Sequence, residues 1–406
     1  MKKTFCFFCL LTAIVAVMTS CKNEADPEAD KSFFTRFFDD QNFNIAYTPL
    51  DVAQTSDGGY LILAAQRTIE ATGDEVNPAR IYVLKTDASG GVVKDVTLGE
   101  ALITPAPALM NVRGKFYFFC MDRGNYSIQL VEVGDDGQVT GQMNVGGSYP
   151  LAAGADGDNL ILLSYDNDAR NTVMSLVSTA GKIVKAKGYG VGAADGGPYA
   201  PEQVILDHVN RQGKQMPFFV GKTTTGLYYF NGIYNYGLSV VFTDLNAAKP
   251  IGVINGFNDD GGISALLSLA GGKFAVSRFN FGDNYVIPAV SLPTTGDASN
   301  LGGLAFPELT PNATVVIRSA TINGKQRVVF GSNTRGKQIA LYGYEQSDGS
   351  LAGVRYMGFS NSFEIAAITP TEDDGLVVLG TTYIAGRFPR VCLFKLSSEA
   401  LGKSFQ

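Results

Sequence analysis

The sequence predicts an all-β fold made of repeated antiparallel units, and three observations carry this prediction. Glycine is unusually frequent, at 47 of 406 residues, well above the average of about 7%. Two kinds of short turn alternate along the chain, and apolar runs of strand length lie between them. No stretch shows helical periodicity together with capping residues. A high glycine content is expected where many tight turns connect many short strands.

Turns of the first kind recur at a regular spacing, and most contain an Asp-Gly, Asn-Gly or similar pair. They fall at residues 56–59, 112–115, 155–158, 211–214, 270–273, 322–325 and 372–375. Turns of the second kind alternate with them, at residues 87–90, 135–137, 179–181, 244–246, 294–296, 347–349 and 399–402. From Gly58 to Gly375 the chain advances 317 residues in six steps, about 53 residues per repeat. Asp-Gly and Asn-Gly pairs supply the positive φ angles of hairpin turns.

The apolar runs beside these turns are typical of strands that are covered on both faces. One run follows each turn of the first kind, as at residues 60–65, and another precedes each turn of the second kind, as at residues 81–84. Near-continuous apolar strands indicate sheets packed between two neighbours. Four strands per repeat, stacked face to face around an axis, form the blade of a β-propeller. The sequence therefore predicts a seven-bladed β-propeller with four-stranded antiparallel blades, in a single domain over residues 33–406.

The first repeat carries the most regular motif. Asp57, Gly58, Gly59 and Tyr60 precede one apolar strand, and a second apolar strand precedes Asp87. This unit resembles a blade of the bacterial DGGY-type propeller repeats. By its phasing, the resemblance covers residues 33–406, and it is sharp only in the first and last repeats. It implies the propeller fold and little about function, because one scaffold serves many functions.

The last repeat lacks an outer strand, since only residues 403–406 follow its second turn. An apolar segment at residues 33–38 precedes the first inner strand, which is expected at residues 50–55. We expect residues 33–38 to pair as the outermost strand of blade 7, so that an N-terminal strand closes the ring. This pairing would also cover a strand edge that otherwise invites aggregation.

Residues 1–20 have the pattern of a secretory signal peptide. Lys2 and Lys3 precede an apolar run at residues 5–17, which is shorter than the ~20 residues that span a bilayer. Small residues then lead to Cys21, in a pattern that resembles a bacterial lipobox. The resemblance implies cleavage before Cys21 and lipidation of that residue, which would anchor the chain in a membrane. The alternative is an ordinary signal peptide with a chance cysteine.

Residues 21–32 form a polar and acidic stretch that reads as a flexible tether. An acidic stretch just after the lipidated cysteine resembles the export signal of Bacteroidota-type surface lipoproteins. Lys22 stands where an aspartate is associated with retention in the inner membrane. We therefore expect an outer-membrane lipoprotein exposed at the cell surface, with a periplasm-facing lipoprotein as the alternative.

Cys120 and Cys392 are the cysteines that remain once the signal peptide and Cys21 are set aside. Each lies in an apolar run, and the repeat phasing places them in different blades. We therefore predict two buried free thiols and no disulfide, although the expected compartment is oxidising.

The charge and composition exclude several classes of function. Removing residues 1–20 removes two lysines and no acid, so 32 basic residues become 30 against 38 acidic ones, a net charge of −8. This acidic balance argues against nucleic acid as a partner. The chain has one histidine, His208, and no tryptophan, which disfavours histidine-based catalysis and tryptophan sugar platforms. Acidic turns such as residues 156–159 lack the full calcium-loop pattern, so we expect no metal and no cofactor.

The expected binding surface is the rim where the longer loops gather, which we call the loop rim. It carries the connections between blades and those from the second to the third strand of each blade. The latter are residues 67–79, 121–125, 164–171, 222–236, 277–285, 332–337 and 381–389. They vary in length, while the turns of the opposite rim, the turn rim, stay short. Variable loops on a rigid scaffold are where function tends to reside.

Each of these loops, or its edge, carries a cation. The set is Arg67, Arg123, Arg170, Lys222, Arg278, Arg335 and Arg387. Aromatic residues lie among them, including Phe279 and Tyr383. A positive rim on an acidic chain would attract carboxylate, phosphate or catecholate oxygens. The alternative is that these cations are solvated or pair with nearby acids.

Residues 222–236 form the most aromatic of these loops and include Tyr228, Tyr229 and Tyr234. One interpretation is a finger that offers aromatic faces to a ligand. The other is that the rings pack on the rim or extend the strands into a hairpin.

These observations favour a surface-anchored binding protein that holds a ligand on the loop rim and passes it to a TonB-dependent transporter or another surface protein. The cationic and aromatic rim fits an anionic or aromatic small molecule, such as a ferric siderophore or a tetrapyrrole, or an acidic glycan. A protein-interaction or adhesion scaffold is the second hypothesis. A polysaccharide-active propeller enzyme is the third, and the scarcity of histidine and tryptophan disfavours it.

Overall fold

The computed structural model describes residues 32–39, 41–69, 78–192, 200–211, 213–258, 260–385 and 387–405. The predicted signal peptide, Cys21 and all but the last residue of the tether lie outside this set. Among the described residues, no helix is both long enough and apolar enough to cross a membrane.

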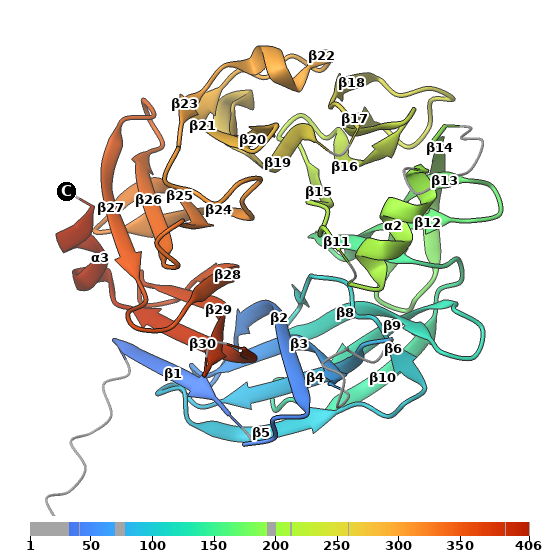
Figure 1. The fold of residues 1–406 in the computed structure, drawn as a ribbon. Coiled ribbons are helices and arrows are strands. Elements are labelled where there is room, and N and C mark those ends of the chain that lie inside the picture. The colour runs from blue at the N-terminus through green and yellow to red at the C-terminus, as the bar shows by residue number, and fades with distance from the viewer. Residues whose placement is uncertain are drawn as a thin grey trace, which may run out of the picture.

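Most of the regular secondary structure in the described residues is antiparallel strand, grouped in sheets around a central opening (Figure 1). The first sheet group contains β2 (Ile45–Gln54), β3 (Tyr60–Thr68), β4 (Arg80–Thr86) and β5 (Val92–Thr97). The second contains β7 (Met110–Val112), β8 (Lys115–Asp122), β9 (Ile128–Val133) and β10 (Val139–Asn144). The short β6 (Leu102–Ile103) pairs with both β4 and β8 and so links the two groups.

The middle of the chain forms three further sheets. One contains β11 (Pro150–Asp156), β12 (Asn159–Asp166), β13 (Asn171–Ser178) and β14 (Ile183–Gly190). The next contains β15 (Phe219–Lys222), β16 (Tyr228–Tyr234), β17 (Gly237–Thr243) and β18 (Gly252–Asn255), with β22 (Gly296–Asp297) parallel to β18. The third contains β19 (Gly261–Ser268), β20 (Phe274–Asn280), β21 (Asp283–Val290) and β23 (Leu304–Ala305).

The last part of the chain forms two sheets, and the second of them includes the N-terminal strand. The first contains β24 (Val315–Ile322), β25 (Lys325–Asn333), β26 (Ile339–Glu345) and β27 (Leu351–Met357). The second contains β28 (Phe363–Pro370), β29 (Leu376–Ile384), β30 (Phe388–Leu396) and β1 (Phe34–Phe38). Four-stranded antiparallel sheets that succeed one another around an axis are the architecture of a β-propeller, so the predicted all-β propeller class is correct.

Segment 33–38 does pair with the sheet formed by the end of the chain. β1 runs antiparallel to β30, with Phe34 opposite Lys395 and Phe38 opposite Val391. Phe34 is buried, in a hydrophobic cluster that also contains Tyr60 of β3. A strand from the beginning of the described chain is therefore the outermost strand of the last sheet, and it contributes Phe34 to the core that this sheet shares with the first.

Arg390 of β30 clamps this junction. Its side chain is completely buried, and its Nε donates a hydrogen bond to Asp39 Oδ1 at 2.7 Å. The two Nη atoms donate to the carbonyl oxygens of Ile45 and Asn42, each at 2.8 Å. The hydrogen bond from Arg390 lowers the pKa of Asp39. A single guanidinium thus ties β30 to the chain that leaves β1 and to the start of β2.

The turn that opens the first repeat is organised by Asp57. Asp57 Oδ1 accepts hydrogen bonds from Thr55 Oγ1 at 2.7 Å and from the Gly59 amide at 2.9 Å. The same carboxylate binds the Nζ atom of Lys85, whose side chain is only 2% exposed. A Cβ on Gly59 would lie 2.6 Å from Lys85 Nζ and would collide with the Thr86 carbonyl. The second glycine of the motif therefore leaves room for a buried lysine.

The last repeat uses the same arrangement. Asp373 accepts from Thr371 Oγ1 at 2.6 Å and binds Lys395 Nζ at 2.6 Å, and the Lys395 side chain is also buried. Gly375 occupies the position equivalent to Gly59, and a Cβ there would collide with Lys395 Nζ. This shared network explains why the motif is sharp in the first and last repeats.

The prediction that no segment is helical is wrong at two places in the described part of the chain. α2 (Pro201–Val209) begins with a proline at its first turn and has no side-chain N-cap, so its start signal is weak. His208, the single histidine, lies in this helix. α3 (Ser398–Ser404) begins at Ser397, whose side chain accepts from the Ala400 amide, and it replaces the predicted turn at residues 399–402. The described residues also contain two short 3₁₀ turns, η1 (Ala270–Gly272) and η2 (Ala298–Leu301).

The prediction for the cysteines is confirmed. Cys120 in β8 and Cys392 in β30 are buried free thiols in separate sheets. Burial raises the pKa of both thiols well above the ordinary value, so neither is a reactive thiolate at neutral pH.

Candidate functional site

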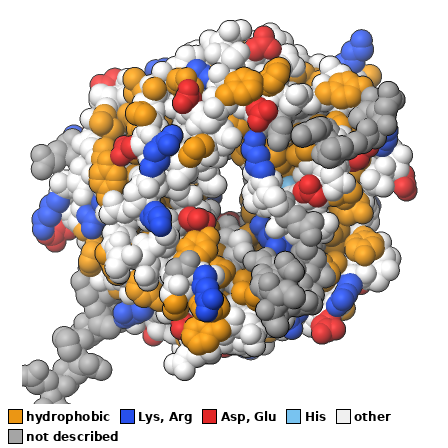
Figure 2. Space-filling view, in the orientation of Figure 1, with side chains coloured by type: hydrophobic (Ala, Val, Ile, Leu, Met, Phe, Trp, Pro, Cys, Tyr) orange, Lys and Arg blue, Asp and Glu red, His pale blue; other side chains and the backbone are white. Residues whose placement is uncertain are grey.

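The loop rim, which includes α2, faces the viewer in Figures 1 and 2. Six of the seven predicted cations lie toward this rim, and the structure shows what each of them contacts. Residues 222–236, which were predicted to be an aromatic loop, do not form a loop at this rim.

The interpretation of residues 222–236 as a loop is wrong. Residues 228–234 form β16, and β16 pairs with β15 on one side and with β17 on the other. The first turn of this repeat is therefore at residues 223–226, where the Gly226 amide donates to the Thr223 carbonyl. The expected turn at residues 211–214 follows α2 instead, because α2 and the segment after it are inserted before β15. The insertion shifts the phase of this repeat by one strand.

Lys222 and Tyr228 consequently lie at the turn rim. Lys222 Nζ binds Asp156 Oδ1 at 2.8 Å, and Tyr228 Oη donates to Asp156 Oδ2 at 2.7 Å. Tyr229 is 3% exposed and packs in the hydrophobic cluster around Phe242. Tyr234, at the other end of β16, lies toward the loop rim. These residues do not form a finger that presents aromatic faces together.

Two of the arginines at the loop rim are buried and hold backbone carbonyl groups. Arg67 is 5% exposed and donates to the carbonyl oxygens of Asn210 and Arg211, just after α2. Arg278 is also 5% exposed, donates from Nε to the Gly302 carbonyl at 2.6 Å, and lies 3.9 Å from the Tyr285 ring. Arginines with such contacts stabilise the loops of the rim and add little positive charge to its surface.

The remaining predicted rim residues also contact groups of the protein. Arg170 pairs with Glu202 at 3.0 Å and Arg123 with Glu100 at 3.7 Å. Arg335 Nε donates to the Pro307 carbonyl, and Arg387 lies over the ring of Phe388. Phe279 is buried beneath Lys214, and Tyr383 Oη donates to Glu364. As ligand contacts these residues stay predictions, and the rim is less positive than their number suggested.

Replacing Arg278 with alanine is expected to lower the free energy of unfolding by about 2 kcal/mol. The change removes a buried side chain together with its hydrogen bond to the Gly302 carbonyl and its stacking on Tyr285. The exposed Arg335 provides the control, and Arg335→Ala is expected to change stability by less than about 0.5 kcal/mol. Urea denaturation followed by circular dichroism measures both, and equal stabilities of the two variants would contradict the structural role of Arg278.

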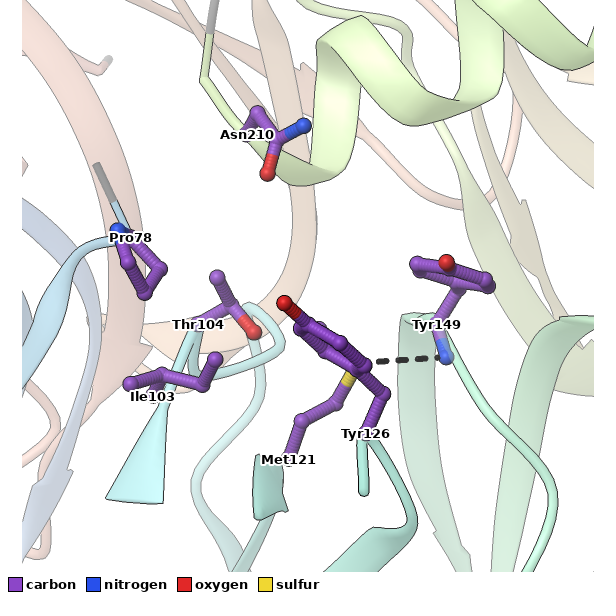
Figure 3. A pocket seen from close by; sticks show the side chains of 7 residues that line it. All are labelled: Pro78, Ile103, Thr104, Met121, Tyr126, Tyr149 and Asn210. Carbon is purple, nitrogen blue, oxygen red and sulfur yellow. Dashed lines mark hydrogen bonds between the residues drawn. The ribbon is translucent and has the colours of Figure 1, made fainter. Parts of the chain in front are cut away.

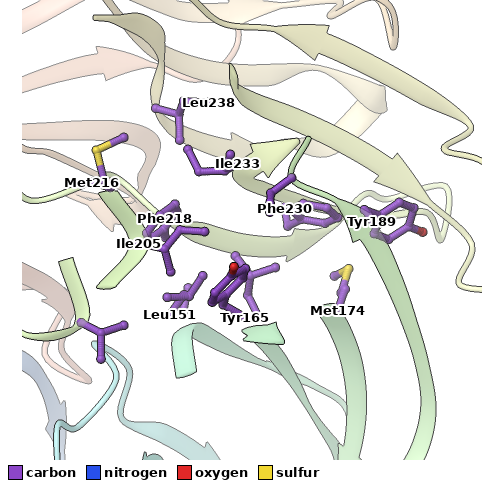
Figure 4. Packing of buried hydrophobic residues seen from close by; sticks show 14 of the residues in the cluster. Leu151, Tyr165, Met174, Tyr189, Ile205, Met216, Phe218, Phe230, Ile233 and Leu238 are labelled. Carbon is purple, nitrogen blue, oxygen red and sulfur yellow. The ribbon is translucent and has the colours of Figure 1, made fainter. Parts of the chain in front are cut away.

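α2 is the main feature of the loop rim that sequence reasoning missed. His208 Nδ1 accepts a hydrogen bond from the Met216 amide at 2.9 Å, and its ring lies edge-on to Phe218. Desolvation lowers the pKa of His208, so the ring is neutral and accepts this bond at neutral pH. Ile205 packs with Phe218 in the cluster shown in Figure 4. These contacts pin the helix across the edge of the third and fourth sheets.

A pocket of about 160 Å³ lies on the loop rim, between the first three sheets and the end of α2 (Figure 3). Its lining comes from six connections and strand ends that are far apart in sequence. The lining residues are Pro78, Ile103, Thr104, Met121, Tyr126, Tyr149 and Asn210. None of them was among the predicted site residues.

Three of these lining residues have a left-handed backbone, with φ of 49° at Thr104, 58° at Tyr126 and 52° at Tyr149. Residues other than glycine, asparagine and aspartate rarely adopt such angles, and a β-branched threonine least of all. Strained backbone of this kind persists where the surroundings hold it and often gathers at binding sites. Thr and Tyr carry no sequence signal for this conformation, so the sequence could not reveal the pocket.

Polar atoms at and beside the pocket retain unused hydrogen-bonding capacity. Thr104 is 5% exposed, and its Oγ1 has no hydrogen-bond partner among the described residues. The Tyr149 ring lies 6.2 Å from that of the buried Tyr165, whose hydroxyl likewise has no partner in the described part of the chain. Burial raises the pKa of Tyr165, and the nearby Glu202 adds to the effect. The described residues contain no group of three or more His, Cys, Asp or Glu side chains suited to a metal ion.

Comparison with known proteins adds no assignment of function. No protein-family model matches the chain, and no curated protein matches it in sequence. The chain is similar to the solved structure of the Dos1 propeller, with 11% identity, a TM-score of 0.49, and coverage of 93% of this chain and 98% of that chain. It is also similar to the β-propeller domain of the Trilobed protease from Pyrococcus furiosus, with 8% identity, a TM-score of 0.45, and coverage of 86% and 93%.

A third similar chain belongs to the crystal structure of the Mitotic Checkpoint Complex, with 10% identity, a TM-score of 0.44, and coverage of 89% of this chain and 93% of that chain. Identities this low carry nothing about ligands. The assignment of this chain to the β-propeller class therefore rests on its own sheet order.

Proposed function

We propose that the sheets are the seven blades of one ring and that β1 closes it as the outer strand of the last blade. Seven hydrophobic clusters among the described residues support this proposal, each lying mainly between two successive sheets. The cluster around Phe34 and Tyr60 packs the last sheet against the first. A velcro strand of this kind ties the two ends of the chain together without a covalent bond.

We further propose that the chain is an outer-membrane lipoprotein exposed at the cell surface and anchored through Cys21. The lipobox-like sequence and the acidic residues after it support this address. Incorporation of radiolabelled palmitate into the chain, and its loss in Cys21→Ala, would test the anchor. Digestion of the protein on intact cells by proteinase K would separate surface exposure from a periplasm-facing orientation.

The function that the geometry supports best is ligand binding on the loop rim. The pocket between the first three sheets and α2 carries this proposal, because it joins strained backbone, exposed aromatic surface and a buried threonine whose hydroxyl has no partner in the described part of the chain. Concave sites with apolar walls and a few polar groups are where small ligands usually bind. The predicted transfer of the ligand to a TonB-dependent transporter remains part of the proposal.

A protein-interaction scaffold is the second candidate, and a different observation favours it. Phe257 and Phe281 are 56% and 67% exposed on the loop rim, and their ring centroids lie 5.4 Å apart. Exposed aromatic pairs are common at protein interfaces. The third hypothesis is a polysaccharide-active enzyme. The described residues that line the pocket include no carboxylate that would support it.

A panel of ligands tests the binding proposal on the purified chain. The panel contains dextran, mannan, polygalacturonate, haem and a ferric catecholate, each measured by biolayer interferometry. We expect at least one of them to bind and Tyr126→Ala to weaken that binding by tenfold or more. Leu351 is an exposed residue at the turn-rim end of β27, so Leu351→Ala is the control and should bind normally. Binding that Leu351→Ala abolishes and Tyr126→Ala spares would contradict the proposal.

A further inference from the structure

We propose that the pocket on the loop rim binds one neutral pyranose ring, such as the terminal sugar of a glycan. This inference rests on the proposed binding function and specifies its ligand. Four observations support it: the volume of the pocket, the absence of charge in its described lining, its mixture of polar and apolar atoms, and the way its walls are held.

The volume admits the six-membered ring of one sugar, whose exocyclic groups would extend through the open side of the pocket. The pocket measures about 160 Å³, close to the ~150 Å³ of an engineered protein cavity that holds one benzene molecule. A tetrapyrrole or an intact siderophore is several times larger than this space. A chain of sugars is accommodated only if one ring enters and the rest extends outward along the rim.

The charge of the lining favours a neutral ligand. Of the described residues that line the pocket, none carries a formal charge at neutral pH. The nearby Arg67 directs its guanidinium to the carbonyl oxygens of Asn210 and Arg211. The nearby Arg170 is paired with Glu202. An anion in the pocket would lose its water without gaining an opposite charge, which is costly.

The polar and apolar atoms of the lining match a ring that has hydroxyl groups on its edge and C–H groups on its faces. Ile103, Met121 and Pro78 supply apolar surface. The Asn210 amide lies above the space, and the Tyr126 hydroxyl is directed toward it from below (Figure 3). The Thr104 hydroxyl is buried beside this space and has no partner among the described residues. Hydrogen-bonding side chains around the lining are better satisfied by several ligand hydroxyls than by one.

The walls are held in place before any ligand arrives. Tyr149 is fixed by a hydrogen bond from its amide to Met121 Sδ at 3.3 Å. The Asn210 backbone is held by Arg67, and Arg211 Nη2 reaches the Pro105 carbonyl next to Thr104. A preformed site loses little conformational entropy on binding. The left-handed backbone at three lining positions belongs to this preformed arrangement.

Ligand-observed NMR and titration calorimetry on the full chain test the inference. The probes are the methyl glycosides of glucose, galactose and mannose, with galacturonate and catechol as the charged and the phenolic alternatives. We expect at least one methyl glycoside to bind. We expect Thr104→Val and Asn210→Ala each to weaken its binding tenfold or more.

Thr225 provides a matched control, because it is an exposed threonine in a turn of the opposite rim. Thr225→Val removes a hydroxyl as Thr104→Val does, and it should leave the affinity unchanged. Circular dichroism and the thermal midpoint of each variant show whether it is folded. If Thr104→Val does not fold, Asn210→Ala provides the test of the pocket.

Two outcomes overturn the inference. If galacturonate or catechol binds and the methyl glycosides do not, and if Thr104→Val weakens that binding, the pocket is a ligand site of another chemistry and the proposed function stands. If none of these probes binds, the pocket does not take a single ring. The proposed function then depends on the separate panel and on its Tyr126→Ala variant.

Discussion

Replacing Arg390 with methionine is expected to lower the free energy of unfolding by about 3 kcal/mol. The guanidinium is fully buried and holds Asp39 together with the carbonyl oxygens of Asn42 and Ile45. Removing one partner of a buried ion pair typically costs about 3–5 kcal/mol. The lower end of that range applies here, because the Asp39 side chain is 28% exposed and retains water.

Arg387 gives the matched control for this change. It lies three positions earlier in the chain, is exposed, and contacts the ring of Phe388. Arg387→Met should therefore change stability by less than about 0.5 kcal/mol. Urea denaturation measures the stability of both variants. Limited proteolysis near residues 39–45 reports on the junction between β1, β2 and β30. If Arg390→Met is as stable as Arg387→Met, the clamp does not hold β1 and β2 together.

Replacing Asp57 with alanine is expected to destabilise the fold by about 3 kcal/mol, because it leaves Lys85 buried without its carboxylate. The double variant Asp57→Ala/Lys85→Met should recover most of this loss, since it removes the stranded charge as well. Asp348 is the control. It accepts hydrogen bonds from Ser350 in a turn of the second kind and has no buried lysine among its described contacts, so Asp348→Ala should cost about 1 kcal/mol.

Asp57 also makes the free energy of unfolding depend on pH, and the direction of this dependence can be predicted. Burial of Asp57 acts to raise its pKa, but hydrogen bonds from Lys85, Thr55 and the Gly59 amide outweigh this and lower the pKa to about 2. Because the folded value lies below the unfolded value, the stabilisation is complete above about pH 4 and is lost as the pH falls toward 2. Asp57→Ala should therefore lose less stability than the parent chain between pH 4 and pH 2. A parallel decline of the two proteins would contradict the network.

The periodicity of the fold could be predicted because tight turns demand particular residues. Asp57 and Gly59 mark such a turn in sequence, since a carboxylate must cap the turn and a glycine must leave room for Lys85. The prediction failed at β16 for a physical reason. α2 is inserted before β15 without a side-chain N-cap, so the turn signal at residues 211–214 was assigned to the wrong strand pair.

The candidate site was much less predictable than the fold. The position of Arg278 at a strand end was evident, but its acceptor is the backbone carbonyl of Gly302, and any residue supplies a carbonyl. Thr104 and Tyr149 line the pocket, and both have a left-handed backbone. Threonine and tyrosine are not residue types that indicate this conformation in a sequence. Tertiary packing imposes both features, and a single sequence contains no local signal for them.

The register of β1 has a consequence for how the molecule stands on a surface. Phe34, two residues from the first described residue, pairs with Lys395 at the turn-rim end of β30. In the proposed lipoprotein, β1 would therefore begin at the turn rim, the rim opposite the pocket. Tension on the tether would act first on the pairing between β1 and β30, so the strand proposed to close the ring would also bear the mechanical load of the anchor.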